Sequence, residues 1–254
     1  MGLDLAWSEG NTSGAVALDW DGCSAFVGGS VLLKSNEEVV SFVGEQLGPP
    51  AVVVAVDAPL VVPNLEGTRP GDRELSRVYR RFGAGAYPAN RRRFRGKVRG
   101  EELVRKLIEL GFTSGPHVGR QAHGRRVVEV YPHPALVELF QLPRTLQYKA
   151  RQGRSYEHRW AELERLIGLL RGLEQGKPPL QAGAWLDLHD PRGLRGRGLK
   201  ALEDLLDGLL CAYIALHLWY WGPPGYRCFG DSERGYILVP VQPSRARGRP
   251  AGRR

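Results

Sequence analysis

Three aspartates lie inside or directly beside apolar stretches, where a carboxylate is costly to bury without a partner. Asp4 is flanked by leucines in GLDLAW, and Asp57 ends the run AVVVAV directly before an Ala-Pro pair. Asp207 lies in a long leucine-rich segment near the carboxyl end. Carboxylates held close together repel one another unless a cation lies between them, and hard oxygen ligands suit Mg²⁺ or Mn²⁺. The residue types therefore predict Asp4, Asp57 and Asp207 as ligands of a divalent metal site for phosphoryl chemistry.

Two further acids could complete such a site. Asp204 lies one helical turn before Asp207 on the same predicted helix face, so it is a further candidate metal ligand. Glu129 lies between valines in RRVVEVYPHP and is a fourth candidate catalytic carboxylate, although the same alternation fits a strand that turns Glu129 toward solvent. For each aspartate the alternative is a structural ion pair with one of the many arginines.

Basic residues are concentrated in two segments of a chain whose formal net charge is +9. Residues 244–254 (SRARGRPAGRR) carry arginines and no acid, and their composition predicts a disordered tail. Residues 75–100, here called the basic segment, hold nine basic residues and no acid, interleaved with Tyr79, Phe82, Tyr87 and Phe94. One interpretation is a solvated surface, and the other is a nucleic-acid contact surface with aromatic rings for stacking. The candidate phosphate-binding residues are Arg77, Arg80, Arg81, Arg91, Arg92, Arg93, Arg95 and Lys97.

Other reaction classes find little support. The three cysteines are scattered and form no CxxC pair, so neither a disulfide framework nor a thiolate zinc site is indicated. No GxSxG elbow is present, which leaves an acyl-enzyme mechanism without a nucleophile motif. GLRGRG at 193–198 matches neither the P-loop nor the dinucleotide-binding pattern, and a flexible basic loop is the better interpretation.

The elements that must position these acids follow from hydrophobic periodicity and turn residues. Residues 2–33 predict an antiparallel meander of three strands, and residues 51–56 a central strand that is covered on both faces. Helices are predicted at 36–47, starting near a possible Asn36 cap, and within 71–83, 101–112, 155–176 and 199–222. A strand is predicted over 125–134 and a last one over 235–240.

Length and composition fit one α/β domain. The chain has 254 residues, of which 42% are apolar, enough for a sizeable core. We expect a single domain over 1–243, with a basic insertion at about 64–100. The apolar runs are shorter than a bilayer span and the first residues carry no basic leader, so we expect a cytoplasmic protein.

Several stretches taken together resemble the domain-of-unknown-function family 429. They include GLDLAW, VAVDAPL, RELSRVYRRFGAGAYPANRR, VVEVYPHP followed later by Tyr148 and Lys149, KALEDLLDGLLCAYIAL and FGDSERGYILVP. The resemblance runs from Gly2 to Pro240. It implies a ribonuclease-H-like fold with a mixed five-stranded sheet, in which an antiparallel meander precedes parallel strands and helices flank the sheet.

The resemblance also implies roles for residues. Nucleases of that fold carry carboxylates on the first strand, the central strand and the last helix, which match Asp4, Asp57 and Asp207. A DxxD pair on the last helix, Asp204 and Asp207, is similar to that of Holliday-junction resolvases, whereas Glu129 has no matching position. Lys149, in the YK pair, is a further expected nucleic-acid contact.

The leading hypothesis is a Mg²⁺- or Mn²⁺-dependent nuclease that cuts DNA or RNA, with Asp4 bridging two metal ions that Asp57 and Asp207 also hold. A second is a nucleic-acid-binding protein that keeps the fold and the basic surface but does not cut. A third, a phosphotransferase related to the actin-like ATPases, is disfavoured because DLAWSEGNTSG lacks the tight phosphate-binding turn expected after Asp4.

Overall fold

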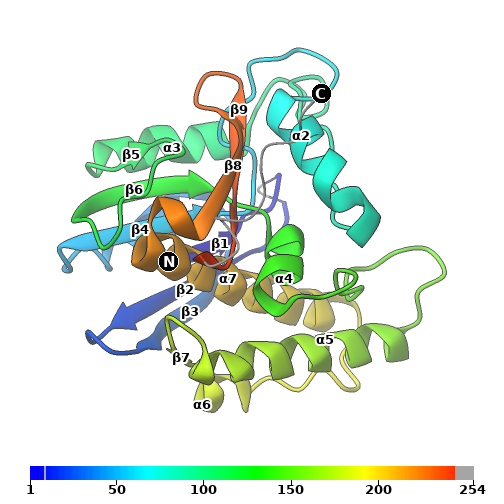
Figure 1. Ribbon diagram of the computed structural model, residues 1–254. Coiled ribbons are helices and arrows are strands. Elements are labelled where there is room, and N and C mark those ends of the chain that lie inside the picture. Colours follow the sequence, from blue (N-terminus) through cyan, green and yellow to red (C-terminus); the bar gives the residue numbers. More distant parts are fainter. Residues whose placement is uncertain (9, 244–254) are drawn as a thin grey trace.

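The computed structural model describes residues 1–8 and 10–243, and it has a mixed sheet at its centre with helices on both faces (Figure 1). The predicted tail at 244–254 lies outside the described residues. Within the described part, none of the helices is long and apolar enough to cross a membrane.

The sheet has seven strands in the order β5-β6-β4-β1-β2-β3-β7. β1 (Gly2–Asp4), β2 (Ser13–Trp20) and β3 (Ala25–Leu33) form the antiparallel meander, and β4 (Ala51–Val56) and β6 (Gly124–Glu129) continue it in parallel. The predicted α/β class and the antiparallel-then-parallel arrangement are confirmed. The predicted number of five strands is wrong, because β5 (Thr113–Ser114) and β7 (Leu180–Gln181) add a two-residue parallel strand at each edge.

Each face of the sheet is covered by different helices. α1 (Asn36–Gly44) and α3 (Arg99–Glu109) pack on one face, against Leu3 and the even-numbered valines of β4. Ser35, not Asn36, caps α1, and Glu38 completes a capping box. α4 (Pro132–Phe140), α5 (Tyr156–Arg171) and α7 (Gly196–Trp221) cover the other face.

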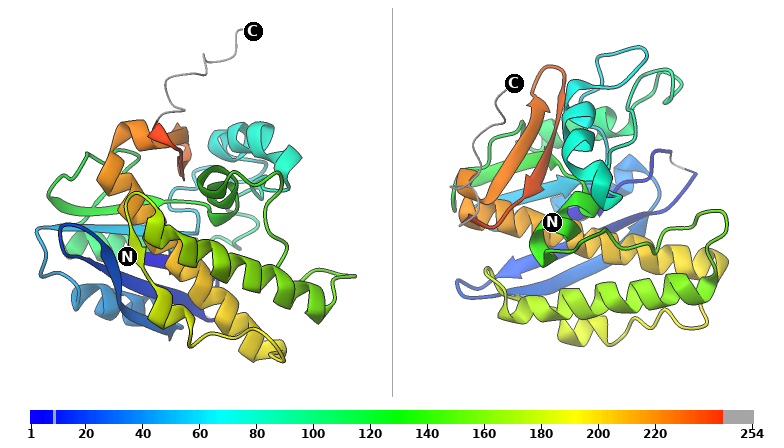
Figure 2. Two further views of the ribbon diagram at one scale, coloured as in Figure 1. Left: turned by 60° about the horizontal axis from the view of Figure 1, so that its bottom comes forward. Right: turned by 45° about the vertical axis from the view of Figure 1, so that its right-hand side comes forward.

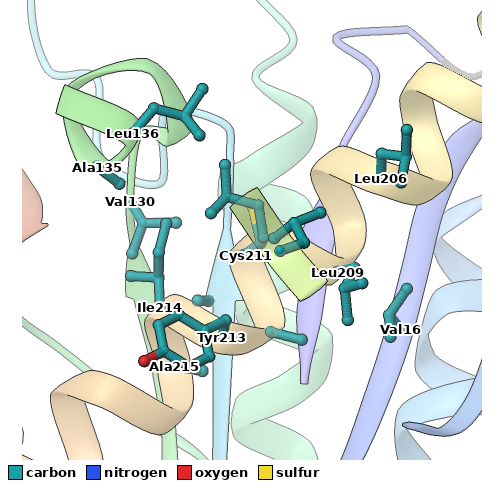
Figure 3. Close-up of a cluster of buried hydrophobic side chains, with 14 of the residues drawn as sticks. Val16, Val130, Ala135, Leu136, Leu206, Leu209, Cys211, Tyr213, Ile214 and Ala215 are labelled. Carbon is teal, nitrogen blue, oxygen red and sulfur yellow. The ribbon is translucent and has the colours of Figure 1, made fainter. Parts of the chain in front are cut away.

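The core beneath α7 joins side chains that are distant in sequence. Figure 3 shows Cys211 and Ile214 of α7 among Val16 of β2, Val130 after β6 and Leu136 of α4. The short helices η2 (Gly172–Gln175) and α6 (Gly183–Leu186) follow α5 and lead toward α7. α7 lies over the central strands β1, β2 and β4. Its distance from the sheet therefore determines how closely its side chains approach β1.

A second, smaller layer lies beside the main sheet. The strand predicted at 235–240 is β9 (Gly235–Pro240), which pairs with β8 (Tyr226–Asp231) in a separate antiparallel hairpin after η3 (Pro223–Gly225). α2 (Pro70–Tyr79) begins in the loop before the basic segment, and η1 (Arg80–Phe82) lies within that segment. α2 lies beside the hairpin (Figure 2). Its residues Leu75 and Tyr79 pack in a small core cluster with side chains of the hairpin. One parallel bridge, from Val130 to Leu238, links the hairpin to the end of β6.

α7 approaches the sheet closely because glycines face it. A Cβ atom built on Gly14 of β2 would lie 1.8 Å from the Asp204 carbonyl oxygen, and one on Gly2 of β1 would lie 1.9 Å from the Ala212 nitrogen. Backbone atoms cannot yield to such contacts as a flexible side chain can. These glycines therefore set the distance between Asp4 on β1 and the acids on α7.

We expect Gly14→Ala to lower the free energy of unfolding by about 3 kcal/mol or more, because the new methyl group must push α7 from the sheet. The measurement is urea unfolding followed by circular dichroism. Gly168→Ala in α5 is the control, since nothing lies within 4 Å of its Cβ position and alanine favours a helix by up to ~1 kcal/mol. Equal stabilities of the two variants would contradict the close-packing account.

Candidate functional site

Asp4 and Asp57 are brought side by side by the pairing of β1 with β4. The register pairs Leu3 with Val56, and each aspartate is the next residue along its strand. Residues paired in a parallel register point to the same face of the sheet. Both aspartates therefore lie at the carboxyl ends of neighbouring strands, on the face that α7 covers.

Asp207 of α7 completes the group of three acids, which we call the aspartate cluster. Its side chain is buried, and its Oδ1 accepts a hydrogen bond of 2.6 Å from the Tyr148 hydroxyl. The Lys149 ammonium forms an ion pair with Asp207 Oδ2 and lies 3.5 Å from Asp4 Oδ2. Lys149 thus bridges the acid of β1 and the acid of α7.

The charges in the cluster are unbalanced. Burial, together with the nearby Asp4 and Asp207 carboxylates, raises the pKa of Asp57 well above its ordinary value. Burial acts to lower the pKa of Lys149, but the Asp207 and Asp4 carboxylates outweigh it and the pKa is raised. Three carboxylates therefore face one ammonium ion, and the arrangement attracts further positive charge.

The buried acids that precede Asp207 on α7 have different partners. Asp204, a predicted metal ligand, accepts a hydrogen bond of 2.9 Å from Thr12 Oγ1 and pairs with Lys200. It therefore ties the loop between β1 and β2 to α7. Glu203 forms a buried ion pair of 2.6 Å with Arg159 of α5.

Arg159 is a residue that the sequence interpretation missed. Besides its ion pair, its Nε donates a hydrogen bond of 3.0 Å to the Tyr148 carbonyl oxygen. It fixes the backbone that carries Tyr148 and Lys149, and so holds both side chains toward Asp207. A signal for this residue exists in the sequence, because Arg159 falls on the helical stripe of buried leucines formed by Leu163, Leu166 and Leu170.

Glu129, the fourth predicted catalytic acid, is not brought into the aspartate cluster. The register pairs it with Val56, one position before Asp57, and both acids line one small cavity, but the Glu129 carboxylate is engaged by Arg69. Its Oε1 lies 2.5 Å from Arg69 Nη2, and its Oε2 accepts hydrogen bonds of 3.0 Å from Arg69 Nη1 and 2.8 Å from the Leu60 backbone N–H. Arg69 in turn pairs with Asp72 of α2 at 2.7 Å. Glu129 therefore anchors the segment that leads from β4 to α2.

The aspartate cluster offers oxygen ligands to a metal ion. Within the described residues, no group of three or more His, Cys, Asp or Glu side chains is placed to hold a metal ion, so an ion bound by two carboxylates would take its other ligands from water or substrate. Asp207 Oδ2 is buried and, despite its ion pair with Lys149, receives no hydrogen bond of good geometry from the described residues. The donors present are carboxylate oxygens with an excess of negative charge, the chemistry that Mg²⁺ and Mn²⁺ prefer. Asp4 and Asp57 therefore fit a divalent cation, with Lys149 holding Asp207.

Most of the predicted phosphate-binding residues lie on the surface of the basic segment. Arg91 pairs with Glu101 at 2.8 Å and Arg92 pairs with Glu66 at 2.5 Å. Lys149 stands apart from them in the aspartate cluster, with 34% of its side chain exposed. The exposed members of the predicted set are Arg77, Arg80, Arg81, Arg92, Arg93, Arg95 and Lys97.

The aromatic residues of the basic segment divide into buried and exposed groups. Tyr79 is fully buried, and its hydroxyl donates a hydrogen bond of 2.8 Å to Glu138. Phe82 and Phe94 are partly buried against small core clusters. Tyr87 is 68% exposed. Of the four rings that the sequence offered for stacking, Tyr87 is thus the one that presents most of its surface to solvent.

We expect Glu129→Gln to lower the free energy of unfolding by about 3 kcal/mol, because the buried Arg69 then loses its strongest anionic partner. Chemical denaturation measures the loss. The matched control is Glu66→Gln, which breaks the exposed ion pair with Arg92 and should change stability by less than about 1 kcal/mol. If the two substitutions cost the same, Glu129 does not anchor the segment between β4 and α2.

Comparisons with known proteins agree with the resemblance in the sequence. The family model described as protein of unknown function (DUF429) matches residues 2–233. The comparisons with curated proteins and with solved structures each gave no match. Because the matched region covers nearly the whole chain and includes all three acids of the aspartate cluster, the protein belongs to the DUF429 family.

Proposed function

We propose that this protein is a nuclease of the ribonuclease-H-like type that hydrolyses phosphodiester bonds in DNA or RNA with a bound Mg²⁺ or Mn²⁺ ion. The observation that carries the proposal is the convergence of Asp4, Asp57 and Asp207 from β1, β4 and α7. The antiparallel meander β1-β2-β3 followed by the parallel strands β4 and β6 supports it, since the family resemblance implies this arrangement. The cytoplasm remains our expected location.

The roles of the residues follow from their contacts. Asp4 and Asp57 would hold the metal ion, which when bound activates water and offsets charge on the phosphate. Tyr148 fixes the Asp207 carboxylate by its hydrogen bond, and Asp207 together with Asp4 fixes the Lys149 ammonium. An ammonium group has three N–H donors. Two of them face the carboxylates, so the third can donate to a phosphate oxygen of the substrate.

The position of Lys149 changes the expected number of metal ions from two to one. The leading hypothesis from the sequence placed an ion between Asp4 and Asp207, where the Lys149 ammonium lies. A second dication there would be repelled by the ammonium group. We therefore propose one ion at Asp4 and Asp57, with Lys149 supplying the other positive charge.

A nucleic-acid-binding protein that does not cut is the second candidate function. The observation that favours it is the same ion pair, since Lys149 already offsets part of the charge that a metal ion would neutralise. The exposed arginines of the basic segment serve both candidates equally. Salt-sensitive binding that needs no divalent ion, in a protein that cuts none of the substrates, would favour this candidate.

We expect Asp4→Asn and Asp57→Asn each to reduce the cleavage rate at least ~100-fold. Loss of a residue that only supports a metal ligand lowers metal affinity or activity by about 10–100-fold, and loss of a direct ligand should lower it at least as much. The assay uses labelled single-stranded, duplex, hybrid and branched substrates with Mg²⁺, Mn²⁺ or EDTA. Asp231→Asn is the control, because this exposed acid pairs with Arg234 in the turn between β8 and β9. Cleavage that persists in EDTA, or in the Asp4→Asn variant, would contradict the proposed mechanism.

We expect Lys149→Met to raise the number of bound Mn²⁺ ions from one to two per chain, because it removes the cation between Asp4 and Asp207. Electron paramagnetic resonance of free Mn²⁺ counts the bound ions without requiring activity. Lys177→Met, at a lysine that contacts the Trp221 ring, is the control and should leave one ion bound. Two ions on the wild-type protein would show that Lys149 does not replace a metal.

A further inference from the structure

Two aromatic side chains are exposed next to the aspartate cluster. Trp7 lies three residues beyond Asp4 and is 41% exposed, and Tyr87 of the basic segment is 68% exposed. Both line a small cavity of about 60 Å³ that Asp57 also lines. The two rings come from segments far apart in sequence, so the fold itself brings them to the carboxyl ends of β1 and β4.

Arg93 connects the two rings. Its guanidinium carbon lies 5.2 Å from the centre of the Trp7 ring and 5.7 Å from the centre of the Tyr87 ring, both within the range of a cation–π contact. Phe94 supports Trp7 from the edge, with ring centres 5.1 Å apart. Trp7, Tyr87 and Arg93 therefore form a set of planar groups, which we call the stacking site.

Burial in the protein core does not account for the stacking site. Leaving a large aromatic side chain in water forgoes about 1.5–3 kcal/mol of the free energy that its burial would give. Tyr87, at 68% exposed, forgoes most of this gain, and Trp7, at 41% exposed, forgoes part of it. Aromatic and guanidinium planes held at a protein surface among basic residues are suited to stack on bases.

We propose that the stacking site binds an unpaired nucleobase of DNA or RNA and directs the protein to single-stranded or locally unpaired substrates. In a duplex both faces of each base are covered by its neighbours, so only an unpaired base can offer a face to Trp7 or Tyr87. The cavity is too small to enclose a nucleotide, so the base stacks at its rim. This inference rests on the proposed function for its substrate and names the form of nucleic acid that enters.

The adjoining charges fit the same substrate. Arg95 and Lys97 follow Arg93 along the exposed part of the basic segment and can contact phosphates that flank the stacked base. Trp7 lies close along the chain to Asp4, so a base held there places its own backbone near the aspartate cluster. Recognition by stacking is tolerant of sequence, because every base has an aromatic face.

The test measures binding without metal, so that it does not depend on cleavage. Fluorescence anisotropy in EDTA compares labelled single strands of DNA and of RNA with a blunt-ended, fully paired duplex of two strands, for wild type, Trp7→Ala, Tyr87→Ala and Tyr87→Phe. Base stacking on an aromatic ring is worth ~1–3 kcal/mol, and 1.4 kcal/mol is tenfold. We expect each alanine variant to bind single strands about tenfold more weakly and the duplex within about twofold of wild type. Tyr87→Phe keeps the ring and should bind as wild type does.

The control variant is Leu188→Ala, which removes an exposed apolar side chain. Leu188 follows α6, which comes after the edge strand β7 and is far in sequence from Trp7 and Tyr87. The substitution should leave both affinities unchanged. Two results would overturn this proposal: wild-type protein that binds the duplex more tightly than single strands, or alanine variants that lose equal affinity for both substrates. Failure of the nuclease proposal has a different signature, which is cleavage that survives Asp4→Asn.

Discussion

Repulsion among three carboxylates at the carboxyl ends of β1 and β4 is the constraint on which the rest of the site depends. Asp4 and Asp57 are neighbours through the pairing of β1 with β4, and α7 brings Asp207 to them. Such a group is stable only with compensating positive charge. Lys149 supplies part of it by bridging Asp4 and Asp207, and burial, together with the remaining negative charge, raises the pKa of Asp57.

The surrounding fold serves to hold that group together. Gly2 and Gly14 let α7 lie directly on β1 and β2, which no residue with a Cβ atom at these positions would allow. Arg159 holds the backbone of Tyr148 to α7 through Glu203. Beside Asp57, a buried ion pair between Arg69 and Glu129 fixes the segment that follows β4. Close backbone packing and buried ion pairs thus position acids that would otherwise separate.

Local patterns in the sequence predicted the elements but not the contacts between them. The apolar run before Asp57 identified β4, and leucine periodicity identified α7. β5 and β7 are two residues long, too short to carry a pattern. Glu129 is engaged by Arg69, which lies 60 positions away in the sequence, and the alternation of valines around Glu129 does not reveal this partner. Tyr148 contacts Asp207 across 59 residues, so no local spacing could reveal that the YK pair enters the site.

The most direct test of the central claim is X-ray diffraction from crystals of the protein soaked in Mn²⁺, with data collected at the manganese absorption edge. We expect one anomalous peak per chain, within ligand distance of the Asp4 and Asp57 carboxylates, with the Lys149 ammonium still between Asp4 and Asp207. The absence of a peak at Asp4 and Asp57, or a peak in the place of Lys149, would contradict the account.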